Sequence, residues 1–398
     1  LDPEKRNIVG TTVFNLFRGV AASGFTTFFS AYMSRLGYSL TEIGVVVTLS
    51  NIVGALASPA VGYLLDVYSS RLITALTGFA MSASLAMIPL PGGMIPLALS
   101  YTLFNLSVYF SQPARMAFLA RVVERRKLGT AVGLTSFAFT ASRAVGPLLG
   151  GYLVHRFSYT ASFLLLSILC LIGSVLFLTI SCEVGVTRRV GVSSLLGSYR
   201  RALAPGRGLA LLYLFTSLDR VAWNLWHPML SAYLVRRGYD ETSVGVLMSL
   251  PNVVEAIGTP VAGKLTDIIG SSRVLALSEL TAALAAIGLV LPEHFASVMA
   301  SMVLMGLSIS LWIPGYNVYV AKVFENVGEA FASANAARSL VSIPSPYIGG
   351  LLYESLSASA PFALSSAMLI VTTVIALRGL KRMEAFDSQA GARTGGGV

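Results

Sequence analysis

Apolar runs long enough to cross a lipid bilayer recur along the whole chain, and they limit its possible folds more than any other feature. A membrane-spanning helix needs about 20 mainly apolar residues. Runs of that length, separated by short polar connections, predict an all-α membrane protein with twelve transmembrane helices. The predicted spans are 8–34, 40–65, 72–91, 94–120, 128–154, 159–182, 208–235, 241–266, 273–292, 295–322, 328–354 and 359–378.

The composition favours a membrane protein over a soluble one. Only 12% of the 398 residues are charged, against about 25% in soluble domains, so the chain cannot cover a water-facing surface. The net charge of +10 would suggest nucleic-acid binding in a soluble protein. Here most Lys and Arg lie between the apolar runs, on the side that carries both ends of the chain. We expect a multi-pass plasma-membrane protein in contact with lipid, with both termini in the cytoplasm and no nucleic-acid partner.

Residue types suited to metal or enzyme chemistry are scarce. The chain contains two Cys and three widely spaced His residues. It has neither an H-E-x-x-H zinc motif nor a phosphate-binding G-x-x-x-x-G-K-[ST] loop. We therefore expect no metal, no cofactor and no enzymatic activity.

The second half of the chain repeats the first. SAYMSRLGY at 30–38 recurs as SAYLVRRGY at 231–239. The same spacing relates Gly44 to Gly245, Asn51 to Asn252, Pro59 to Pro260, Gly62 to Gly263 and Asp66 to Asp267. Internal similarity of this kind indicates repeated structural modules. We predict six-helix bundles at 1–183 and 208–382, a cytoplasmic linker at 184–207 and a disordered tail at 383–398.

Two motifs that follow the second helix of each half resemble a family signature. GYLLDVYSSR at 62–71 and GKLTDIIGSSR at 263–273 are similar to the G-x-L-x-D-x-x-G-x-[KR] loop of the major facilitator superfamily. The first has Ser69 in place of the inner Gly, and the second carries its basic residue one place late. The resemblance implies a secondary transporter, usually monomeric, that moves a small molecule by alternating access. It also implies gate roles for Gly62, Asp66, Arg71, Gly263, Asp267 and Arg273, because such a carboxylate can meet a helix N-terminus or an Arg.

A further motif leaves two interpretations open. GPLLGG at 146–151 resembles part of the antiporter motif of the same superfamily, with Ser142 in place of its leading Gly. SPYIGG at 345–350 holds a similar place in the second half. The motif is therefore either an exporter signature or a structural repeat.

Ionisable residues inside the predicted spans are candidates for function, because burying charge in a bilayer is costly. They are Arg18, Arg115, Arg143, Asp219, Arg220, Glu255, Glu279 and Arg338. The family resemblance implies that the first, fourth, seventh and tenth helices line a central cavity, flanked by the second, fifth, eighth and eleventh. These helices carry every residue of the set except Glu279, which we expect to pack, or to reach the membrane interface, on a peripheral helix.

Two carboxyl groups are candidates for ion coupling. Asp219 is the repeat equivalent of Arg18, so the two are predicted to face each other, either as a pair that breaks during transport or as a static ion pair. Glu255 is predicted to load and release a proton, or else to pair with Arg338 or Arg143. Desolvation favours the protonated form of a carboxyl group, which suits proton coupling, and sodium remains an alternative ion.

The excess of intramembrane arginine favours an anionic substrate, because a guanidinium pairs well with carboxylate, phosphate or sulfate. The predicted cavity residues are Arg18, Arg143, Arg338, Trp312, Tyr316, Asn317, Asn105 and Tyr109, while Arg115 suits a cytoplasmic gate or, alternatively, contact with the substrate. The predicted function is proton-coupled transport of a small organic anion. An efflux antiporter for amphipathic compounds and an uncoupled uniporter are the alternatives, ahead of a membrane enzyme, a receptor or a lipid scramblase.

Overall fold

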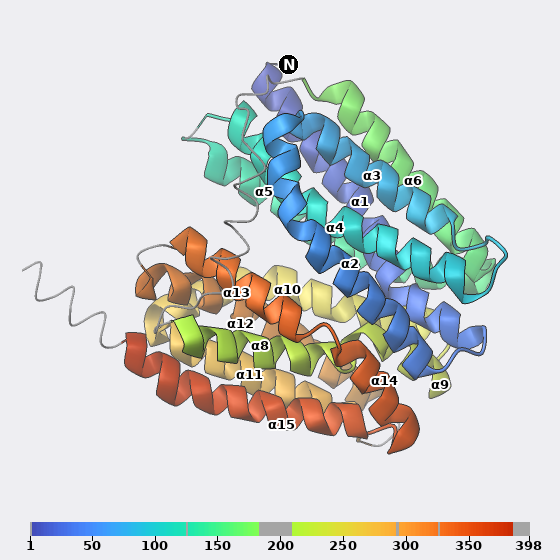
Figure 1. Ribbon diagram of the computed structural model, residues 1–398, viewed down its shortest axis with the longest axis vertical. Helices are drawn as coiled ribbons and strands as arrows, with labels where there is room; N and C mark the ends of the chain where they lie inside the picture. Colours follow the sequence, from blue (N-terminus) through green and yellow to red (C-terminus); the bar gives the residue numbers. More distant parts are fainter. Residues whose placement is uncertain (1, 125, 183–208, 292–293, 325–326, 385–398) are drawn as a thin grey trace, which may run out of the picture. The chain divides into compact units, whose positions relative to one another are not determined.

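The computed structural model describes residues 2–124, 126–182, 209–291, 294–324 and 327–384, without the side chains at 58–60, 62–63, 66, 209, 327–329 and 332. All the regular elements in these ranges are helices (Figure 1), which confirms the predicted all-α class. The first six are α1 (Pro3–Arg35), α2 (Leu40–Val67), α3 (Ser70–Ala86), α4 (Met94–Val122), α5 (Leu128–Arg156) and α6 (Tyr159–Ile180). Each of them matches one predicted span.

The later helices match the remaining predicted spans, although two of these spans are interrupted. The helices are α8 (Leu209–Asn224), α9 (Leu230–Arg236), α10 (Glu241–Ile269), α11 (Ser271–Gly288), α12 (Phe295–Val323), α13 (Val327–Val341), α14 (Ser345–Ser355) and α15 (Ala360–Ile375), which continues into a π-helical turn at Ala376–Leu380. The breaks fall at Pro228 and at Pro344, where a missing N–H and a bulky ring disfavour a continuous helix. Span 208–235 is therefore built from α8, a short 3-10 helix at His227–Met229 and α9, and span 328–354 is built from α13 and α14.

The described residues form two compact units. Unit 1 contains those of 1–199 and 228–252, and unit 2 contains those of 200–227 and 253–398. Residues 228–252, which the predicted division assigns to the C-terminal bundle, thus pack with the N-terminal helices. The predicted linker and most of the predicted tail lie outside the described residues, so the proposed domain boundaries stay a prediction.

The two units repeat the same helix pairings. In unit 1, α1 packs against α5 and α6, and α3 packs against α4 and α6. In unit 2, the equivalent α8 packs against α13 and α15, and α11 packs against α12 and α15. The internal repeat read from the sequence is therefore confirmed as a repeat of the fold.

Matching turns show how closely the repeat is kept. α1 and α9 both end at a glycine with positive φ, 92° at Gly37 and 89° at Gly238, a conformation that favours glycine. The following amides close the turn alike: Tyr38 donates to the Met33 carbonyl at 3.1 Å, and Tyr239 donates to the Leu234 carbonyl at 3.2 Å. The duplicated R-x-G-Y sequence, RLGY at 35–38 and RRGY at 236–239, thus encodes the same helix end.

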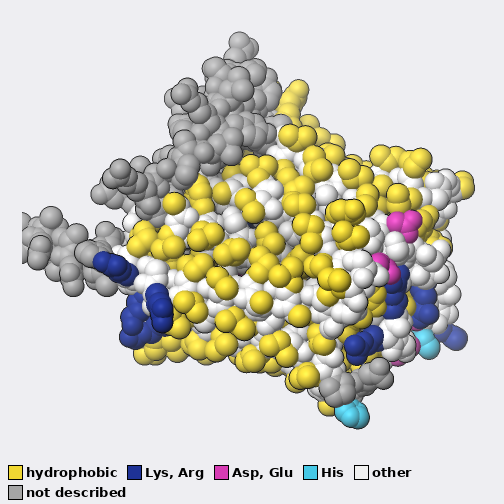
Figure 2. All heavy atoms as spheres, turned by 60° about the horizontal axis from the view of Figure 1, so that its bottom comes forward, with side chains coloured by type: hydrophobic (Ala, Val, Ile, Leu, Met, Phe, Trp, Pro, Cys, Tyr) yellow, Lys and Arg dark blue, Asp and Glu magenta, His cyan; other side chains and the backbone are white. Residues whose placement is uncertain are grey.

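Apolar side chains cover much of the surface, as contact with lipid requires. Large hydrophobic residues are strongly exposed, among them Leu56 at 71%, Ile95 at 71% and Ile268 at 79%. On the face in Figure 2 hydrophobic side chains predominate, and the visible Lys and Arg gather near its edges. Within the described residues, six helices are long and apolar enough to cross a membrane by length and composition alone.

Candidate functional site

Two arginines lie close together inside unit 1. Arg18, in the middle of α1, is only 2% exposed, and its Nη2 donates to the Ser107 carbonyl of α4 at 3.3 Å. Arg115, about two turns further along α4, donates from Nε to the Ser111 carbonyl at 3.3 Å and from Nη1 to the Asn15 side-chain oxygen. The Nε of Arg18 has no hydrogen-bond partner among the described residues. One donor of this pair is therefore available inside the unit.

An aromatic ring and an amide hold the two guanidinium groups. The Phe139 ring of α5 lies under both, with centroid distances of 5.8 Å for Arg18 and 5.0 Å for Arg115. Asn15 donates its amide to the Thr135 carbonyl at 2.7 Å, which turns its oxygen toward Arg115. Cation–π contacts stabilise such charges but do not neutralise them.

The two arginines have no carboxylate as counter-ion in the described part of the chain. Arg35 and Lys127, by contrast, do form ion pairs with carboxylates. The backbone carbonyls and Asn15 compensate the guanidinium groups only partly, because a buried charge needs a paired opposite charge to offset its desolvation. The arrangement is therefore chemically suited to binding an anion. Arg115, for which the sequence suggested a gate role, lies beside Arg18 over the same Phe139 ring. We call Arg18, Arg115, Phe139 and Asn15 the arginine cluster.

Unit 2 carries a buried carboxylate of its own. Asp219 on α8 is 5% exposed, and its Oδ1 has no hydrogen-bond partner among the described residues. Trp223, one turn further along α8, and Arg338 of α13 both lie near enough to interact with the carboxylate. Arg18 belongs to the other unit, so its pairing with Asp219 stays a prediction.

Arg338 also rests on an aromatic stack. Its guanidinium lies 5.0 Å from the ring centroid of Trp312, which stacks on Tyr316 at 4.6 Å with an interplanar angle of 18°. Phe331 of α13 meets Tyr316 edge-on at 5.2 Å. The Trp312 Nε1 and the Tyr316 hydroxyl are buried without hydrogen-bond partners among the described residues. Three predicted cavity residues are thus brought together, whereas Asn317 is exposed on another face of α12.

Glu279 packs inside unit 2, which is one of the two roles expected from the sequence. It is 1% exposed on α11, so the other expectation, a reach to the membrane interface, is wrong. Thr372 of α15 lies 2.7 Å from its Oε2, and Asp219 is within electrostatic range. A peripheral helix therefore carries a carboxyl group into the interior of unit 2.

The other predicted site residues are more scattered. The Asn105 amide donates to Asn51 at 3.0 Å, which joins α4 to α2, and the Tyr109 ring lies against Gly54. Arg143 is half-buried on α5, and Glu255 is 6% exposed on α10. Asn105 and Tyr109 thus contribute to helix packing within unit 1.

The loop-motif residues act mainly at helix ends. Arg71 donates to the Ser181 hydroxyl at 3.0 Å and to the Leu178 carbonyl, at the C-terminal end of α6 where a cation is favourable. Asp267 and Arg273 are exposed, and nothing lies within 4 Å of a Cβ placed on Gly263. The side chains at Gly62 and Asp66 lie outside the described residues, so their gate roles stay predictions.

The carboxylate at the N-terminus of α11 comes from Glu384. Its oxygens accept from the Ser271 hydroxyl at 2.7 Å, from the Ser271 amide at 3.3 Å and from the Ser272 amide at 3.2 Å. A carboxylate satisfies the free amides at a helix start. The residue that meets this helix N-terminus in unit 2 is therefore not Asp267 of the motif.

Within unit 1, the start of the second half contacts α1, α5 and α6. The Arg35 guanidinium pairs with Glu241 at 2.8 Å, and the Tyr159 hydroxyl donates to the same Glu241 oxygen at 2.9 Å. The hydroxyls of Ser30 and Ser231, equivalent positions of the repeat, are 2.9 Å apart. We call these five residues the Arg35–Glu241 contact.

Small residues and a cap support this contact. A Cβ on Gly151 would lie 2.6 Å from the Glu241 carbonyl oxygen, and one on Gly245 would lie 2.5 Å from the Pro147 carbonyl oxygen. In the GPLLGG motif, Gly151 therefore serves close packing of α5 on α10. Asp240 accepts from the Ser243 hydroxyl at 2.5 Å, which lowers the pKa of the Asp240 carboxyl and fixes the start of α10.

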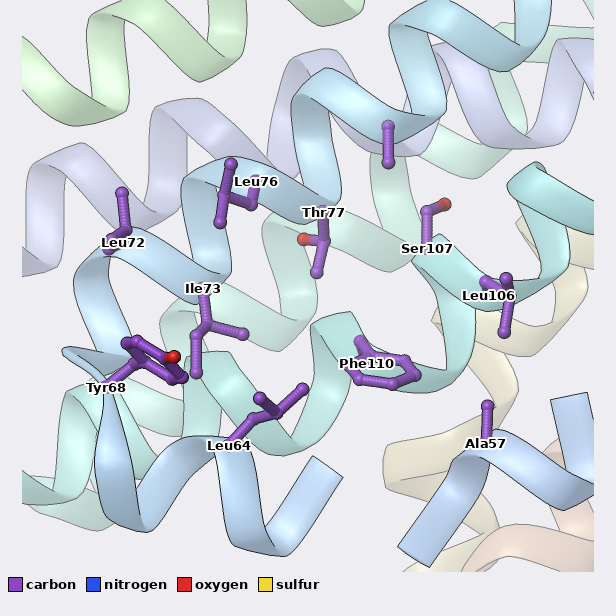
Figure 3. Close-up of a pocket in the computed structure, with 11 residues that line it drawn as sticks. Ala57, Leu64, Tyr68, Leu72, Ile73, Leu76, Thr77, Leu106, Ser107 and Phe110 are labelled. Atoms are coloured by element: carbon purple, nitrogen blue, oxygen red, sulfur yellow. The ribbon is translucent and has the colours of Figure 1, made fainter. Parts of the chain in front are cut away.

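An open apolar groove of about 460 Å³ lies between α2, α3 and α4 of unit 1 (Figure 3). Leu72, Leu76 and Thr77 of α3 line one side, and Phe110 of α4 lines another. Ser107, whose carbonyl receives the Arg18 guanidinium, also lines it. The groove contains none of the predicted cavity residues, and its lining suits an acyl chain or another apolar group.

No group of three His, Cys, Asp or Glu residues that could hold a metal ion is found among the described side chains. The candidate sites are therefore built from arginines, carboxyl groups and aromatic rings.

Comparisons with known proteins agree with the fold. The family model of the Major Facilitator Superfamily matches residues 11–226 and 209–396, so the chain belongs to this family of membrane transporters and is an integral, multi-pass plasma-membrane protein rather than an enzyme. Multidrug resistance protein MdtG of Citrobacter koseri is 23% identical over 397 residues, covering 95% of this chain and 96% of that protein. MdtG of Dickeya zeae is 24% identical over 392 residues, with 95% of each protein covered.

Solved transporter structures have the same fold. A bacterial homologue of the human lysosomal transporter Spinster, inward-facing and unoccupied, has a TM-score of 0.70 at 11% identity, covering 98% of this chain and 97% of that one. The nucleoside transporter NupG has a TM-score of 0.75 at 13% identity, covering 95% of this chain and 99% of that one. At these identities the similarity concerns the fold alone.

Proposed function

We propose that this transporter carries a small organic anion and couples its movement to protons. The observation that carries the proposal is the arginine cluster, in which two guanidinium groups share one aromatic ring without a described carboxylate. An anion would supply the missing counter-charge and would accept the free Nε–H of Arg18. Charge-assisted hydrogen bonds of this type are stronger than neutral ones.

Asp219 is the proposed coupling residue, with Glu255 as a second candidate. A carboxyl group this deeply buried changes charge at a high cost in free energy, so its proton state depends on nearby cations. Arg338 is such a cation, and it also rests on Trp312. If substrate binding draws Arg338 away, Asp219 takes up a proton; if Arg338 returns, Asp219 releases it.

The proposed transport cycle is alternating access. The Arg35–Glu241 contact ties α1 and α6 to the start of α10 at one end of unit 1. Opening that end to a substrate would require this ion pair and the Ser30–Ser231 hydrogen bond to separate. The pair is partly exposed, with side-chain exposures of 50% and 14%, so breaking it costs about 1 kcal/mol or less.

The test is flux through purified protein in liposomes. A panel of organic anions, neutral solutes and lipophilic cations is offered while the internal pH is recorded. We expect uptake of anions, with an apparent affinity that falls about 10- to 150-fold in Arg18→Gln, because a hydrogen bond to a charged group contributes about 1.5–3 kcal/mol. Arg156→Gln is the control, since Arg156 is exposed at the end of α5. Equal losses in both variants, or flux of neutral solutes only, would contradict the proposal.

Efflux of amphipathic compounds is the second candidate function. It is supported by the names of the MdtG relatives and by the apolar groove of Figure 3, which lies beside the carbonyl that receives Arg18. In the same liposomes, proton movement only with lipophilic cations would favour this function. Substrate flux without any proton movement would instead indicate a uniporter.

A further inference from the structure

Three helices of unit 2 meet at a layer of small residues. Ala222 of α8, Ala282 and Ala283 of α11 and Leu369 of α15 form one buried cluster. Alanine has almost no side chain, so the three backbones can approach closely. Residues three or four positions away lie one turn along the same helix face. The layer one turn away therefore receives Asp219 from α8, Glu279 from α11 and Thr372 from α15.

The contacts in this second layer agree with that geometry. Glu279 is 1% exposed, and its Oε2 lies 2.7 Å from the Thr372 hydroxyl. Its Oε1 and the Oδ1 of Asp219 are both buried without hydrogen-bond partners among the described residues. Two buried carboxyl groups thus lie within electrostatic range of each other, each with one free oxygen.

The hydrogen-bond arrangement at Thr372 indicates where a proton is held. The hydroxyl has one hydrogen, yet it lies 2.7 Å from Glu279 Oε2 and 2.8 Å from the Leu369 carbonyl oxygen. A carbonyl can only accept, so both contacts are full hydrogen bonds only when the Glu279 carboxyl is protonated and donates to Thr372. A neutral carboxyl group also avoids the high cost of an unpaired buried charge.

The surrounding charges favour the same distribution. Arg338 and Arg220 both act on Asp219, which is the charged or titratable neighbour that α8 presents to Glu279. On the other segments packed against α11, the described charged side chains are Lys322 at the end of α12 and Arg378, Lys381, Arg382 and Glu384 after α15. The four cations are exposed, and Glu384 is bonded to Ser271 and Ser272 at the N-terminus of α11. Cations thus stabilise a negative charge on Asp219, while Glu279 has none beside it.

We propose that Glu279 is a proton-binding residue that shares one proton with Asp219 during transport. The proton rests on Glu279 while Arg338 faces Asp219. When Arg338 turns to a substrate, the Glu279 O–H bond breaks and an Asp219 O–H bond forms, so that the negative charge moves from Asp219 to Glu279. When Arg338 returns, Asp219 releases this proton to water and Glu279 takes up another, so that each cycle moves one proton. The transport role rests on the proposed proton coupling, whereas the protonation of Glu279 does not.

Infrared difference spectroscopy on the purified full-length protein tests the protonation. Near neutral pH, the spectrum of the native protein minus that of Glu279→Gln should contain the C=O stretching band of a protonated carboxyl group. Thr372→Val should shift this band, because it removes the acceptor hydroxyl, and Thr372→Ser should restore it. Thr373→Val is the matched control, since Thr373 bonds only to the Leu369 carbonyl. A difference spectrum with carboxylate bands alone would overturn the proposal.

Proton movement in liposomes tests the sharing. Substrate-driven proton movement should be lost in Glu279→Gln and kept in Thr373→Val, with substrate exchange still present in both. Unchanged proton movement in Glu279→Gln would overturn the sharing. If the native protein shows the infrared band but moves no protons with any substrate, the proposed coupling fails, while Glu279 stands as a proton-binding residue.

Discussion

The interiors of the two units share a pattern of helix pairing but differ in their charge. Unit 1 buries Arg18 and Arg115 around one phenyl ring, with no carboxylate paired to them among the described residues. Unit 2 buries Asp219 and Glu279, with Arg338 near the first of them. Two copies of one helix arrangement can therefore bury different charged residues and serve different functions. On our proposals, the first copy holds the charge of the substrate and the second holds the proton.

The largest expected effect would separate these two tasks. Asp219→Asn removes the charge on which the proposed coupling depends and leaves the arginine cluster intact. We expect substrate-driven proton movement in liposomes to fall to the level of protein-free vesicles, while exchange of labelled anion across the membrane continues. Loss of exchange together with coupling would show that the division between the units is wrong.

A smaller effect is expected from the ring that both arginines share. Phe139→Leu removes two cation–π contacts, each worth about 0.5–2 kcal/mol. The loss of each contact should therefore lower the affinity for the anion by about 2- to 30-fold. Proton movement per transported anion should not change. Phe137→Leu is the control, because Phe137 is 63% exposed on the same helix. A change of coupling ratio in Phe139→Leu would tie the arginine cluster to the proton as well.

The smallest effect is expected at the Arg35–Glu241 contact, which lies outside both groups of buried charges. Arg35→Gln removes an ion pair worth about 1 kcal/mol or less, which should raise the population of the open contact up to about fivefold. The rate at which a soluble thiol reagent modifies Ser231→Cys, in a background with Cys182→Ser, reports this opening. Glu124→Gln breaks an exposed pair with Lys127 elsewhere and should leave the rate unchanged. Equal rates in both variants would mean that the Arg35 pair does not hold the contact.

The parts of the fold that follow from local patterns were predictable. Apolar runs predicted the helix positions, because each run lies within a few tens of residues. Repeated polar and glycine positions predicted the two copies, because each copy of a motif can be recognised in a short stretch of sequence. The breaks near Pro228 and Pro344 add detail to two of the predicted spans without changing the number of segments.

The site was predictable only in its residue types. Arg18, Asp219 and Arg338 could be chosen because a charge in an apolar run is conspicuous. Phe139 and Asn15 could not, because an ordinary phenylalanine or asparagine gains its role only from the arginine that tertiary packing places beside it. Glu279 was expected to pack or to reach the membrane interface on a peripheral helix; its burial and its contact with Thr372 could not be foreseen, because they depend on alanines of α11 and α8 that let α15 pack closely.

The hydrogen bond between Ser30 and Ser231 joins two positions that are copies of each other. Contacts of this kind arise where a two-fold relation passes between identical partners, as in a symmetric dimer. In a symmetric dimer, one substitution there would alter both sides of the contact at once. In this single chain each serine can be replaced alone, so the two halves of the contact can be varied separately although their positions are equivalent.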